Sequence, residues 1–598
     1  MPKNKYPAIK YTDRDFNSIR ENLIDYAKRY YPDSFKDFNE ASFGALMVDA
    51  VSYIGDMLSF YVDYHANESF LVTSNEYTNV IKHGKALGYK FNNIPSSRGF
   101  VTLFIKVPAS TTGFGIDTDY VPTLSKGSSF STTSGTSFLL IGDVNFGDPK
   151  NEIVVASTNE DSGLPTEYVI KAYGEVISGR LDYQEFKLGE FQRFRKIQLS
   201  DSNVAEIMNV SDSEGNRYYE VDFLSQNTVY ISVINTGADK GTVPNLLRPL
   251  VVPRRFVLER ENGKVFMQFG YGSDKDASKL GFLRPEDVTL EMHARDYISD
   301  TSFDPAKLIK SDKFGICPSK TTLRVSFRTN SQTNINAAAG SILQVQKANF
   351  SFNNSSALSN SQKSTIINSL EVNNEEPVLG DLTYPSLEEI KRRIYDTFPT
   401  QNRAVTASDY KAIVYLMPGK YGSIKRCNVL QDPDAFKRNL NLYVVSEDQN
   451  GNLATTNDVI KNNLKNWVNR YRMINDSVDI LNAQIVHIGI NYTIVPVLER
   501  DRFEVLKKTQ DALRLRFSTI GDIGESIEIS DIYRILNTVP GVSDTVDVSL
   551  VKKSGGLYSQ VDFSIDNAMS FDGRYLISPP TVIFEIKYLD TDIQGTVR

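Results

Sequence analysis

The fold of the N-terminal region is decided by residues 43–67, FGALMVDAVSYIGDMLSFYVDYHAN, in which apolar side chains recur at steps of three and four. This spacing predicts one α-helix from Ala41 to about Asn67, roughly 40 Å long at 1.5 Å per residue. Its apolar stripe is too wide for one neighbouring helix to cover, so we expect a helical bundle. The candidate contacts in that bundle are Phe43, Met47, Ala50, Ile54, Met57, Leu58 and Tyr61.

Two shorter helices are predicted on either side of the long one. An apolar stripe runs at helical spacing from Phe16 to Tyr30, behind a capping-box-like stretch at residues 12–15, and Pro32 ends it. A third helix is predicted from Ser74 to a C-cap at Gly88. Residues 1–95 are therefore helical. They form either a three-helix domain within this chain, which the residues slightly favour, or a bundle shared with other chains.

The hydrophobic period changes from 3.6 to 2 at Gly99, which predicts strands. Asn262-Gly263 between two apolar runs predicts a hairpin with a type I′ turn. We therefore expect an antiparallel β-rich domain over residues 96–275. Residues 329–374 are rich in Ser and Asn and poor in large apolar side chains, so we expect 276–380 to be a β/loop excursion, either on the surface with a modest core or as a partly mobile projection.

The last third of the chain mixes helices and strands. A capping box at Ser386–Glu389 opens a helix, and we expect an α+β domain over residues 381–455. Residues 456–598 form a C-terminal α+β domain in which the alternating strand Val486–Ile494 is followed by helices. The predicted fold class is α+β and multidomain, with an N-terminal long-helix bundle, an antiparallel β-rich middle and mixed C-terminal domains.

Composition excludes several classes of protein. The 598 residues contain 66 Lys+Arg and 73 Asp+Glu, and this acidic balance argues against nucleic-acid binding as the main role. Cys317 and Cys427 are far apart in sequence and suit free thiols in a reducing compartment. The first residues lack the apolar run of a secretory signal, and no 18 consecutive residues are apolar, so no membrane-spanning helix is expected.

No motif in the chain points to catalysis. There is no phosphate-binding loop and no Gly-x-Ser-x-Gly elbow, and Phe269–Gly272 lacks the third glycine of a dinucleotide fingerprint. The four histidines have no zinc-ligand spacing, and we expect His487 to form hydrogen bonds at the surface or a sheet edge. We therefore expect no catalytic, cofactor-binding or metal-ligating residue, and not an enzyme.

Several stretches, taken in order, carry a family resemblance. Tyr11–Phe16 precedes the long helix, Phe269–Gly272 forms a Phe-Gly-x-Gly turn, and Pro318–Leu323 leads into a strand. The most specific stretch is Gln401–Tyr410, QNRAVTASDY, and Val539–Val542 follows near the C-terminus. With these motifs the chain resembles the baseplate J-like family, and within it the larger baseplate wedge subunits of contractile-tailed bacteriophages.

The resemblance implies a structural role in a tail baseplate. Such a subunit would form a heteromeric wedge with other wedge subunits and a second copy of itself, and would bind a sheath-initiator-type protein. Its N-terminal helices would join an inter-subunit bundle, and its C-terminal domain would contact adjacent wedges in a sixfold ring around the hub. It would relay the conformational change that triggers sheath contraction. The resemblance places it in the virion, assembled in the host cytoplasm, with no cofactor, nucleic acid or membrane.

The motif at residues 403–410 is expected to define a turn of the fold. Thr406 is the predicted N-cap and Asp409 lies in the first helical turn. Arg403 binds a carboxylate, and a partner within the domain is favoured over one in another subunit; Tyr410 completes the motif. Two other functions stay open: a fibre-attachment or host-binding adhesin, and a tail-associated cell-wall hydrolase with a carboxylate pair across a cleft.

Overall fold

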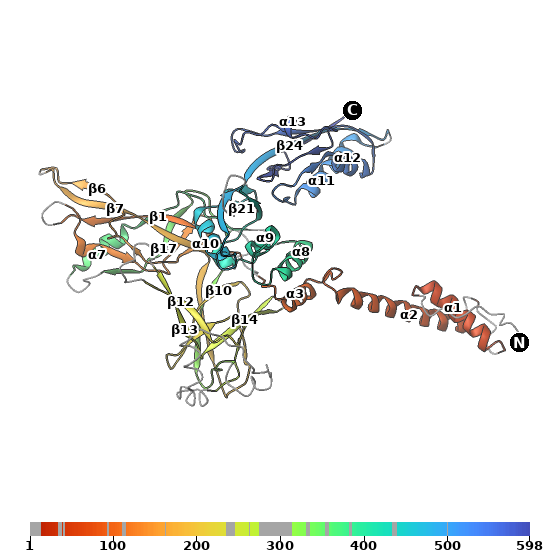
Figure 1. Ribbon diagram of the computed structural model, residues 1–598, viewed down its shortest axis with the longest axis horizontal. Coiled ribbons are helices and arrows are strands. Elements are labelled where there is room, and N and C mark those ends of the chain that lie inside the picture. The colour runs from red at the N-terminus through yellow and green to blue at the C-terminus, as the bar shows by residue number, and fades with distance from the viewer. Residues whose placement is uncertain are drawn as a thin grey trace. The chain divides into compact units, whose positions relative to one another are not determined.

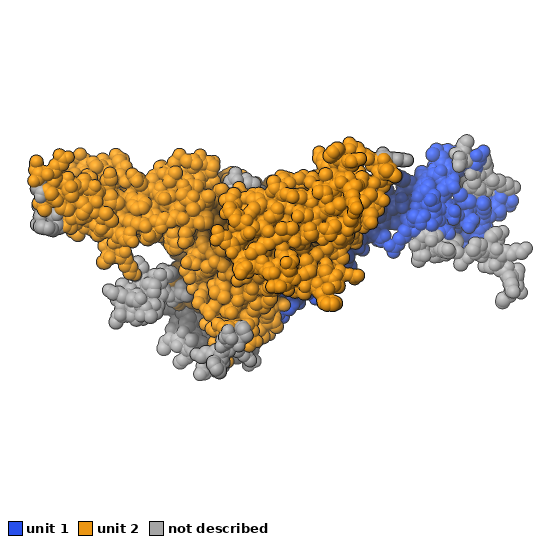
Figure 2. Space-filling view, turned by 90° about the horizontal axis from the view of Figure 1, so that it is seen from above, with its two compact units in different colours: residues 1–91, 385–401 blue, residues 92–384, 402–598 orange. Residues whose placement is uncertain are grey.

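The computed structural model describes residues 14–33, 39, 42–91, 95–110, 115–161, 163–234, 245–261, 263–273, 314–330, 335–352, 358–381, 385–432, 439–498 and 500–598. The chain divides into two compact units, coloured in Figure 2: residues 1–91 with 385–401, and residues 92–384 with 402–598. N-terminal helices are followed by antiparallel and mixed sheets and then by α+β elements (Figure 1). The predicted fold class is confirmed, and the finer domain boundaries stay predictions.

The helices of the first unit begin close to the predicted positions. Helix α1 spans Phe16–Tyr30 and is capped by Asp15, whose carboxylate accepts from the Ser18 N–H at 3.1 Å. The cap is therefore Asp15, and Thr12, the expected one, lies outside the described residues. Helix α2 spans Phe43–Glu68, with the Ser42 hydroxyl accepting from the Ala45 N–H at 3.1 Å.

The remaining helices of the first unit come from both ends of its sequence. Helix α3 spans Tyr77–Ala86 and packs on α8, Leu387–Thr397, which continues into the 3-10 turn η2, Phe398–Thr400. The two helices approach closely because Gly84 has no side chain: a Cβ there would lie 2.6 Å from Phe91 Cζ and 2.9 Å from Ile394 Cδ1.

A sheet built around two long strands opens the second unit. Strands β1, Arg98–Pro108, and β7, Pro165–Ser178, pair antiparallel along the whole length of β1. The alternation predicted for β1 is confirmed, since Val101, Leu103 and Ile105 are fully buried. The sheet order is β17 (Ile342–Lys347), β3 (Ser129–Thr132), β4 (Ser137–Leu140), β7, β1 and β19 (Glu371–Asn373), and β6 (Glu152–Thr158) also pairs with β7.

The Ser/Asn-rich stretch contributes to this sheet, which corrects the expectation of a surface excursion. Strand β17 pairs with β3, β19 pairs with β1, and helix α7, Asn360–Asn368, contacts β1. Ile342, Ile366 and Val372 are buried in the core of the sheet. The stretch has few large apolar residues, and its composition therefore predicted an excursion from the fold. Three of those few residues nevertheless occupy core positions.

A second sheet follows, with its own core. Its order is β8 (Arg180–Lys187), β16 (Thr322–Thr329), β10 (Val204–Asp212), β11 (Arg217–Glu220), β14 (Arg255–Glu261), β15 (Lys264–Phe269) and β9 (Lys196–Gln198). Strands β14 and β15 pair from Phe256↔Phe269 to Glu261↔Lys264, which confirms the predicted hairpin, although Asn262 lies outside the described residues. The shorter elements of this region are η1 (Thr118–Tyr120), β2 (Pro122–Leu124), β5 (Val144–Asn145), β18 (Phe350–Phe352), β12 (Thr228–Ile234) and β13 (Asn245–Val251).

The C-terminal part contains two more sheets with helices packed on them. In the first, β20 (Arg426–Gln431), β21 (Asn439–Glu447), β22 (Leu453–Ala454) and β23 (Ser477–Asn482) carry α9 (Ala407–Tyr415), η3 (Gly419–Tyr421) and α10 (Asp458–Val468). In the second, β24 (Gln484–Pro496), β26 (Val542–Lys552), β28 (Val582–Glu585) and β29 (Ile593–Val597) pack against α11 (Arg502–Phe517) and α12 (Ile529–Thr538). The last short elements are β25 (Ile527–Glu528), β27 (Tyr575–Leu576) and α13 (Ile565–Ala568).

Candidate functional site

The predicted bundle residues all lie on the exposed face of α2. Phe43 is 77% exposed and Leu58 is 59% exposed. Met47, Ala50, Ile54, Met57 and Tyr61 are exposed as well. A wide apolar helix face open to water is unstable unless something covers it. We call these seven residues the apolar face of α2.

The opposite stripe of α2 is small and acidic, and α1 lies against it. Ala45 and Ser52 are buried there, and Asp49, Asp56 and Asp63 recur at every seventh position. Arg20 of α1 pairs with Asp49, and Arg14 Nη1 lies 2.6 Å from Asp63 Oδ1. Among its described side chains α1 buries none. The contact with α1 therefore leaves the apolar face of α2 available for another partner.

Helix α2 is also long and apolar enough to cross a membrane by length and composition alone. The sequence expectation rested on an unbroken apolar run, whereas here the average hydropathy of the helix is high although Ser, Gly and Asp interrupt the run. The three aspartates oppose insertion, since a charged residue at the centre of a spanning helix costs about 2.5–3.5 kcal/mol. Covering this face with another protein therefore costs less free energy than inserting the helix into a membrane.

The corner between α2 and α3 is fastened by Glu68. Its carboxylate accepts from the Asn79 side chain at 2.9 Å, the Asn75 N–H at 2.7 Å and the Ser74 hydroxyl at 2.8 Å. These hydrogen bonds, that from Asn79 foremost, lower the pKa of Glu68 to about 2. Because Ser74 serves this corner, α3 begins at Tyr77 and not at Ser74. Sequence analysis did not single out Glu68.

The motif at residues 403–410 lies at the start of α9. Thr406 caps α9: its hydroxyl accepts from the Asp409 N–H at 3.2 Å, and the Asp409 carboxylate accepts from the Thr406 N–H at 2.8 Å. Tyr410 is buried and donates to Asp476 Oδ2 at 2.8 Å. Burial and then this carboxylate raise the pKa of the Tyr410 phenol.

Arg403 has no ion-pair partner among the residues that the structure describes, and it is exposed. The favoured expectation, a carboxylate within the domain, therefore finds no partner in the described part of the chain. The neighbouring Ala404 is fully buried and its N–H donates to the Tyr471 carbonyl at 2.8 Å. The backbone of the motif is thus fixed while the guanidinium of Arg403 faces solvent.

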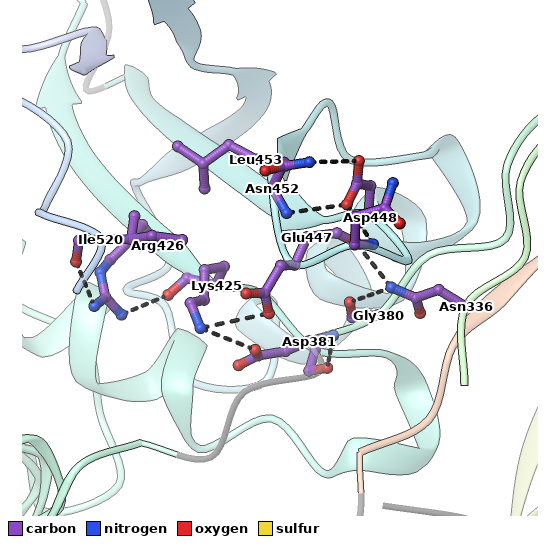
Figure 3. A network of polar contacts seen from close by, with 12 residues as sticks. Asn336, Gly380, Asp381, Lys425, Arg426, Glu447, Asp448, Asn452, Leu453 and Ile520 are labelled. Carbon is purple, nitrogen blue, oxygen red and sulfur yellow. Dashed lines mark hydrogen bonds and ion pairs between the residues drawn. The ribbon is translucent and has the colours of Figure 1, made fainter. Parts of the chain in front are cut away.

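A buried charged cluster ties three parts of the second unit together (Figure 3). Lys425 Nζ lies 3.4 Å from Asp381 Oδ1 and 3.4 Å from Glu447 Oε2. Asn336 donates to the carbonyls of Gly380 at 3.1 Å and Glu447 at 2.9 Å. Residues from the first sheet region, from the segment that precedes α8 and from β20–β21 therefore meet at one point.

Arg426, next to Lys425, links β20 to the C-terminal part (Figure 3). Its guanidinium donates to the carbonyls of Ile520 at 2.9 Å and Gly521 at 3.2 Å, and it pairs with Asp522 at 3.0 Å. The side chain is buried, so this link is shielded from water. We call Lys425, Arg426 and the groups they contact the β20 junction; the short basic pair in the sequence gave no hint of it.

His487 lies in the core and not at the surface, which corrects its expected place. Its Nε2 is 3.0 Å from Glu585 Oε2, and its Nδ1 accepts from the Ser559 N–H at 2.7 Å. Glu585 also accepts from the Leu453 N–H at 2.7 Å. Because both ring nitrogens are bound, this group is a structural tie between strands and offers no free base for catalysis.

Among the residues that the structure describes, no cluster of His, Cys, Asp or Glu has the arrangement of a metal site. Cys317 and Cys427 are buried, and neither forms a disulfide in the described part of the chain. The groups with unusual surroundings, Glu68, Tyr410, Lys425 and His487, are all held by the protein itself. Within the described residues, the most prominent feature available to another molecule is the apolar face of α2.

Comparison with known protein families gives a match over the N-terminal helices. Residues 15–86 match the family model for the N-terminal domain of bacteriophage baseplate proteins. No curated protein matches the sequence. The match covers α1, α2 and α3, the segment that carries the exposed apolar face.

Solved structures give weaker likenesses. The chain resembles a chain of the anti-feeding prophage baseplate, at 9% identity and a TM-score of 0.27, over 96% of this chain and 99% of that one. It also resembles a chain of the type VI secretion system TssK-TssF-TssG baseplate subcomplex, at 9% identity and a TM-score of 0.24, over 74% of this chain and 96% of that one. At these scores neither likeness carries structural detail to this chain.

Proposed function

We propose that this chain is a structural, non-enzymatic subunit of a contractile-tail baseplate, and within it a wedge subunit. One observation carries the proposal: the segment that matches a baseplate N-terminal domain is also the one that exposes a wide apolar helix face. A subunit whose N-terminal helices lack their own core needs other chains to complete it. Assembly supplies that cover.

The occupant of the apolar face is, in this proposal, a helix from another wedge subunit or from a second copy of this chain. Helices with apolar residues at three- and four-residue steps pack into such a bundle. The acidic stripe is already engaged by Arg14 and Arg20, so the added helices pack on the side of Ile54 and Leu58. The bundle would then be heteromeric or shared by two copies.

The remaining partners follow from the same proposal. A ring of wedges needs two different patches on each subunit, because a heterologous contact repeats around the ring. We assign the first to the N-terminal helices and the second to the C-terminal domain, which would contact the adjacent wedge around the hub. A sheath-initiator-type protein would bind the assembled wedge. The chain would reside in the virion tail after assembly in the host cytoplasm.

The proposed relay of the contraction signal uses the β20 junction. Buried ion pairs hold a fixed geometry and are costly to break singly, which suits a joint between bodies that move as units. Lys425 and Arg426 are adjacent in sequence but bind different parts of the unit. A movement of the C-terminal part would therefore reach the segment around Asp381 through one strand.

Quantitative mass spectrometry of purified particles tests the function. The copies of this chain are counted against those of the sheath protein in the same particles. We expect a fixed number that is a multiple of six. Absence from the particles, or a trimeric count that matches the fibres, would overturn the wedge assignment and favour the adhesin.

A further inference from the structure

Strand β6 leaves the first sheet of the second unit with an open edge. It lies beside β7 (Figure 1) and pairs with it over Glu152↔Lys171 to Thr158↔Pro165. The stretch of β7 that pairs with β4 follows at residues 176–178. Of the described strands, only β7 pairs with it. Nearly every residue of β6 is exposed. Its outer row of backbone N–H and C=O groups is therefore free to pair with an added strand.

The side chains of β6 extend the core of the sheet beyond its covered part. The register places Ile105, Ile170 and Ile153 in one row across β1, β7 and β6. The first two are fully buried, whereas Ile153 is 47% exposed. Val107, Tyr168 and Val155 form the next row, which likewise begins buried and ends with Val155 44% exposed.

Edge strands usually carry features that block further pairing, and in β6 the register shifts between Val155 and Ser157 and between Ser157 and Thr158 are confined to its second half, so the first half, Glu152–Val155, is the regular part of the edge. Its sequence, EIVVAST, contains no lysine and no proline, the two residues that most often protect a free edge. It contains three consecutive β-branched apolar residues, Ile153 to Val155, which favour strand pairing. A sequence of this kind at an open edge is costly unless a partner uses it.

The charges around β6 indicate the kind of partner. Asp148, Glu152, Glu160 and Asp161 are exposed near the two ends of the strand, against one exposed lysine, Lys150. A strand that also carried acidic side chains would be repelled. A strand with Lys or Arg at these positions would be attracted, and alternate apolar residues would cover Ile153 and Val155.

We propose that the open edge of β6 binds an extended, basic segment of a neighbouring subunit in the same particle by strand addition. The inference rests on the proposed function, because it requires the chain to be part of a particle. The segment adds backbone hydrogen bonds to β6, places apolar side chains beside Ile153 and Val155, and places cationic side chains beside Glu152, Glu160 and Asp161. This surface is separate from the apolar face of α2.

Hydrogen exchange of the full chain, free and in purified particles, tests the proposal. We expect the amides of residues 152–158 to exchange at least tenfold more slowly in particles than in the free chain. Equal exchange in both states, with the chain present in the particles, would overturn the inference and leave the proposed function intact. Absence of the chain from the particles would instead overturn the proposed function. Protection that appears in the free chain as its concentration rises would identify a second copy as the occupant and overturn the basic segment.

Three variants make the test specific. Ile153→Lys with Val155→Lys should abolish the protection of residues 152–158, because it puts charges where the added strand packs. Phe100→Lys, at a residue of β1 that is 44% exposed, is the matched control and should retain it. Glu160→Lys with Asp161→Lys should reduce the protection at least threefold. Unchanged protection in this last variant would overturn the basic character of the partner, and melting curves of each free variant verify that it folds.

Discussion

Arg14, just before α1, lies 2.6 Å from Asp63 near the end of α2, measured from Nη1 to Oδ1. Both side chains are largely exposed, and ion pairs of this kind contribute only about 0–1 kcal/mol. The ion pairs therefore add little to the contact between the two helices, in which Ile19 of α1 lies against Gly55 of α2, while the apolar face of α2 stays in water. In a helical hairpin the widest apolar stripes usually face each other, whereas here α1 packs on the stripe of small residues of α2.

The first prediction concerns the apolar face of α2. Ile54→Glu with Leu58→Glu should change the free energy of unfolding of the free chain by no more than about 0.5 kcal/mol, because both residues are exposed. Incorporation into particles should fall at least tenfold, since two charges would enter the bundle. Copy number by mass spectrometry measures this.

Asn67→Glu serves as the control for that variant, because Asn67 is exposed on the same helix outside the apolar face. It should incorporate as the unaltered chain does. If the double variant also incorporated normally, the apolar face would not be an assembly surface. If the unaltered free chain floated with lipid vesicles and the double variant did not, a membrane would be its cover.

The second prediction concerns pH and the corner at Glu68. Hydrogen bonds lower the pKa of this carboxyl to about 2 in the folded chain, against about 4.3 when unfolded. A lowered folded pKa gives stability that is present above the unfolded value and is lost as the pH falls through 4 towards 2. The protection factors of the amides of residues 69–79, which are observed exchange rates corrected for the intrinsic effect of pH, should therefore fall over that range.

Glu68→Gln should remove most of this pH dependence and leave fast exchange at neutral pH. The amide oxygen can replace Oε2 and accept from Asn79 and Ser74, or replace Oε1 and accept from Asn75, and in either case the NH₂ group cannot accept from the donors on its side. Exchange of residues 69–79 that stayed equally slow in the variant at pH 7 would show that another contact holds the corner.

Local periodicity predicted α2, β1 and the capped helix α9 to within a few residues, because each is specified by neighbours in sequence. What the sequence could not supply were partners distant along the chain. Tyr410 meets Asp476 across 66 positions and His487 meets Glu585 across 98. For the same reason the pairing of β19 with β1 could not be predicted. β19 is short and has few core residues, so its sequence alone does not indicate a strand. The heptad spacing of Asp49, Asp56 and Asp63 was visible and could have located the side that α1 covers.

The third prediction concerns the buried phenol of the motif. Tyr410→Phe removes the donor to Asp476 and leaves that carboxylate without its 2.8 Å partner. An unpaired buried polar group costs about 1–3 kcal/mol, and we expect the free energy of unfolding to fall by that amount. Chemical denaturation measures the change. Tyr395→Phe, at a residue that is 69% exposed, should cost less than about 0.5 kcal/mol, and equal losses for the two would contradict a role for the hydrogen bond.

The last prediction explains the glycine at the end of β15. Gly270 lies against the backbone of the returning chain: a Cβ would be 2.1 Å from the Gly315 carbonyl oxygen and 2.2 Å from that of Phe314. Backbone atoms cannot move aside as a side-chain end can, so Gly270→Ala should lower the free energy of unfolding by about 2 kcal/mol or more. Gly189→Ala, with nothing within 4 Å of the added Cβ, is the control and should be nearly neutral. Because Gly272 binds the same segment, through its N–H to the Gly315 carbonyl at 2.9 Å, the loss should appear first as faster hydrogen exchange at residues 314–317. A Gly270→Ala variant as stable as Gly189→Ala would show that this turn tolerates a wider spacing than the structure has.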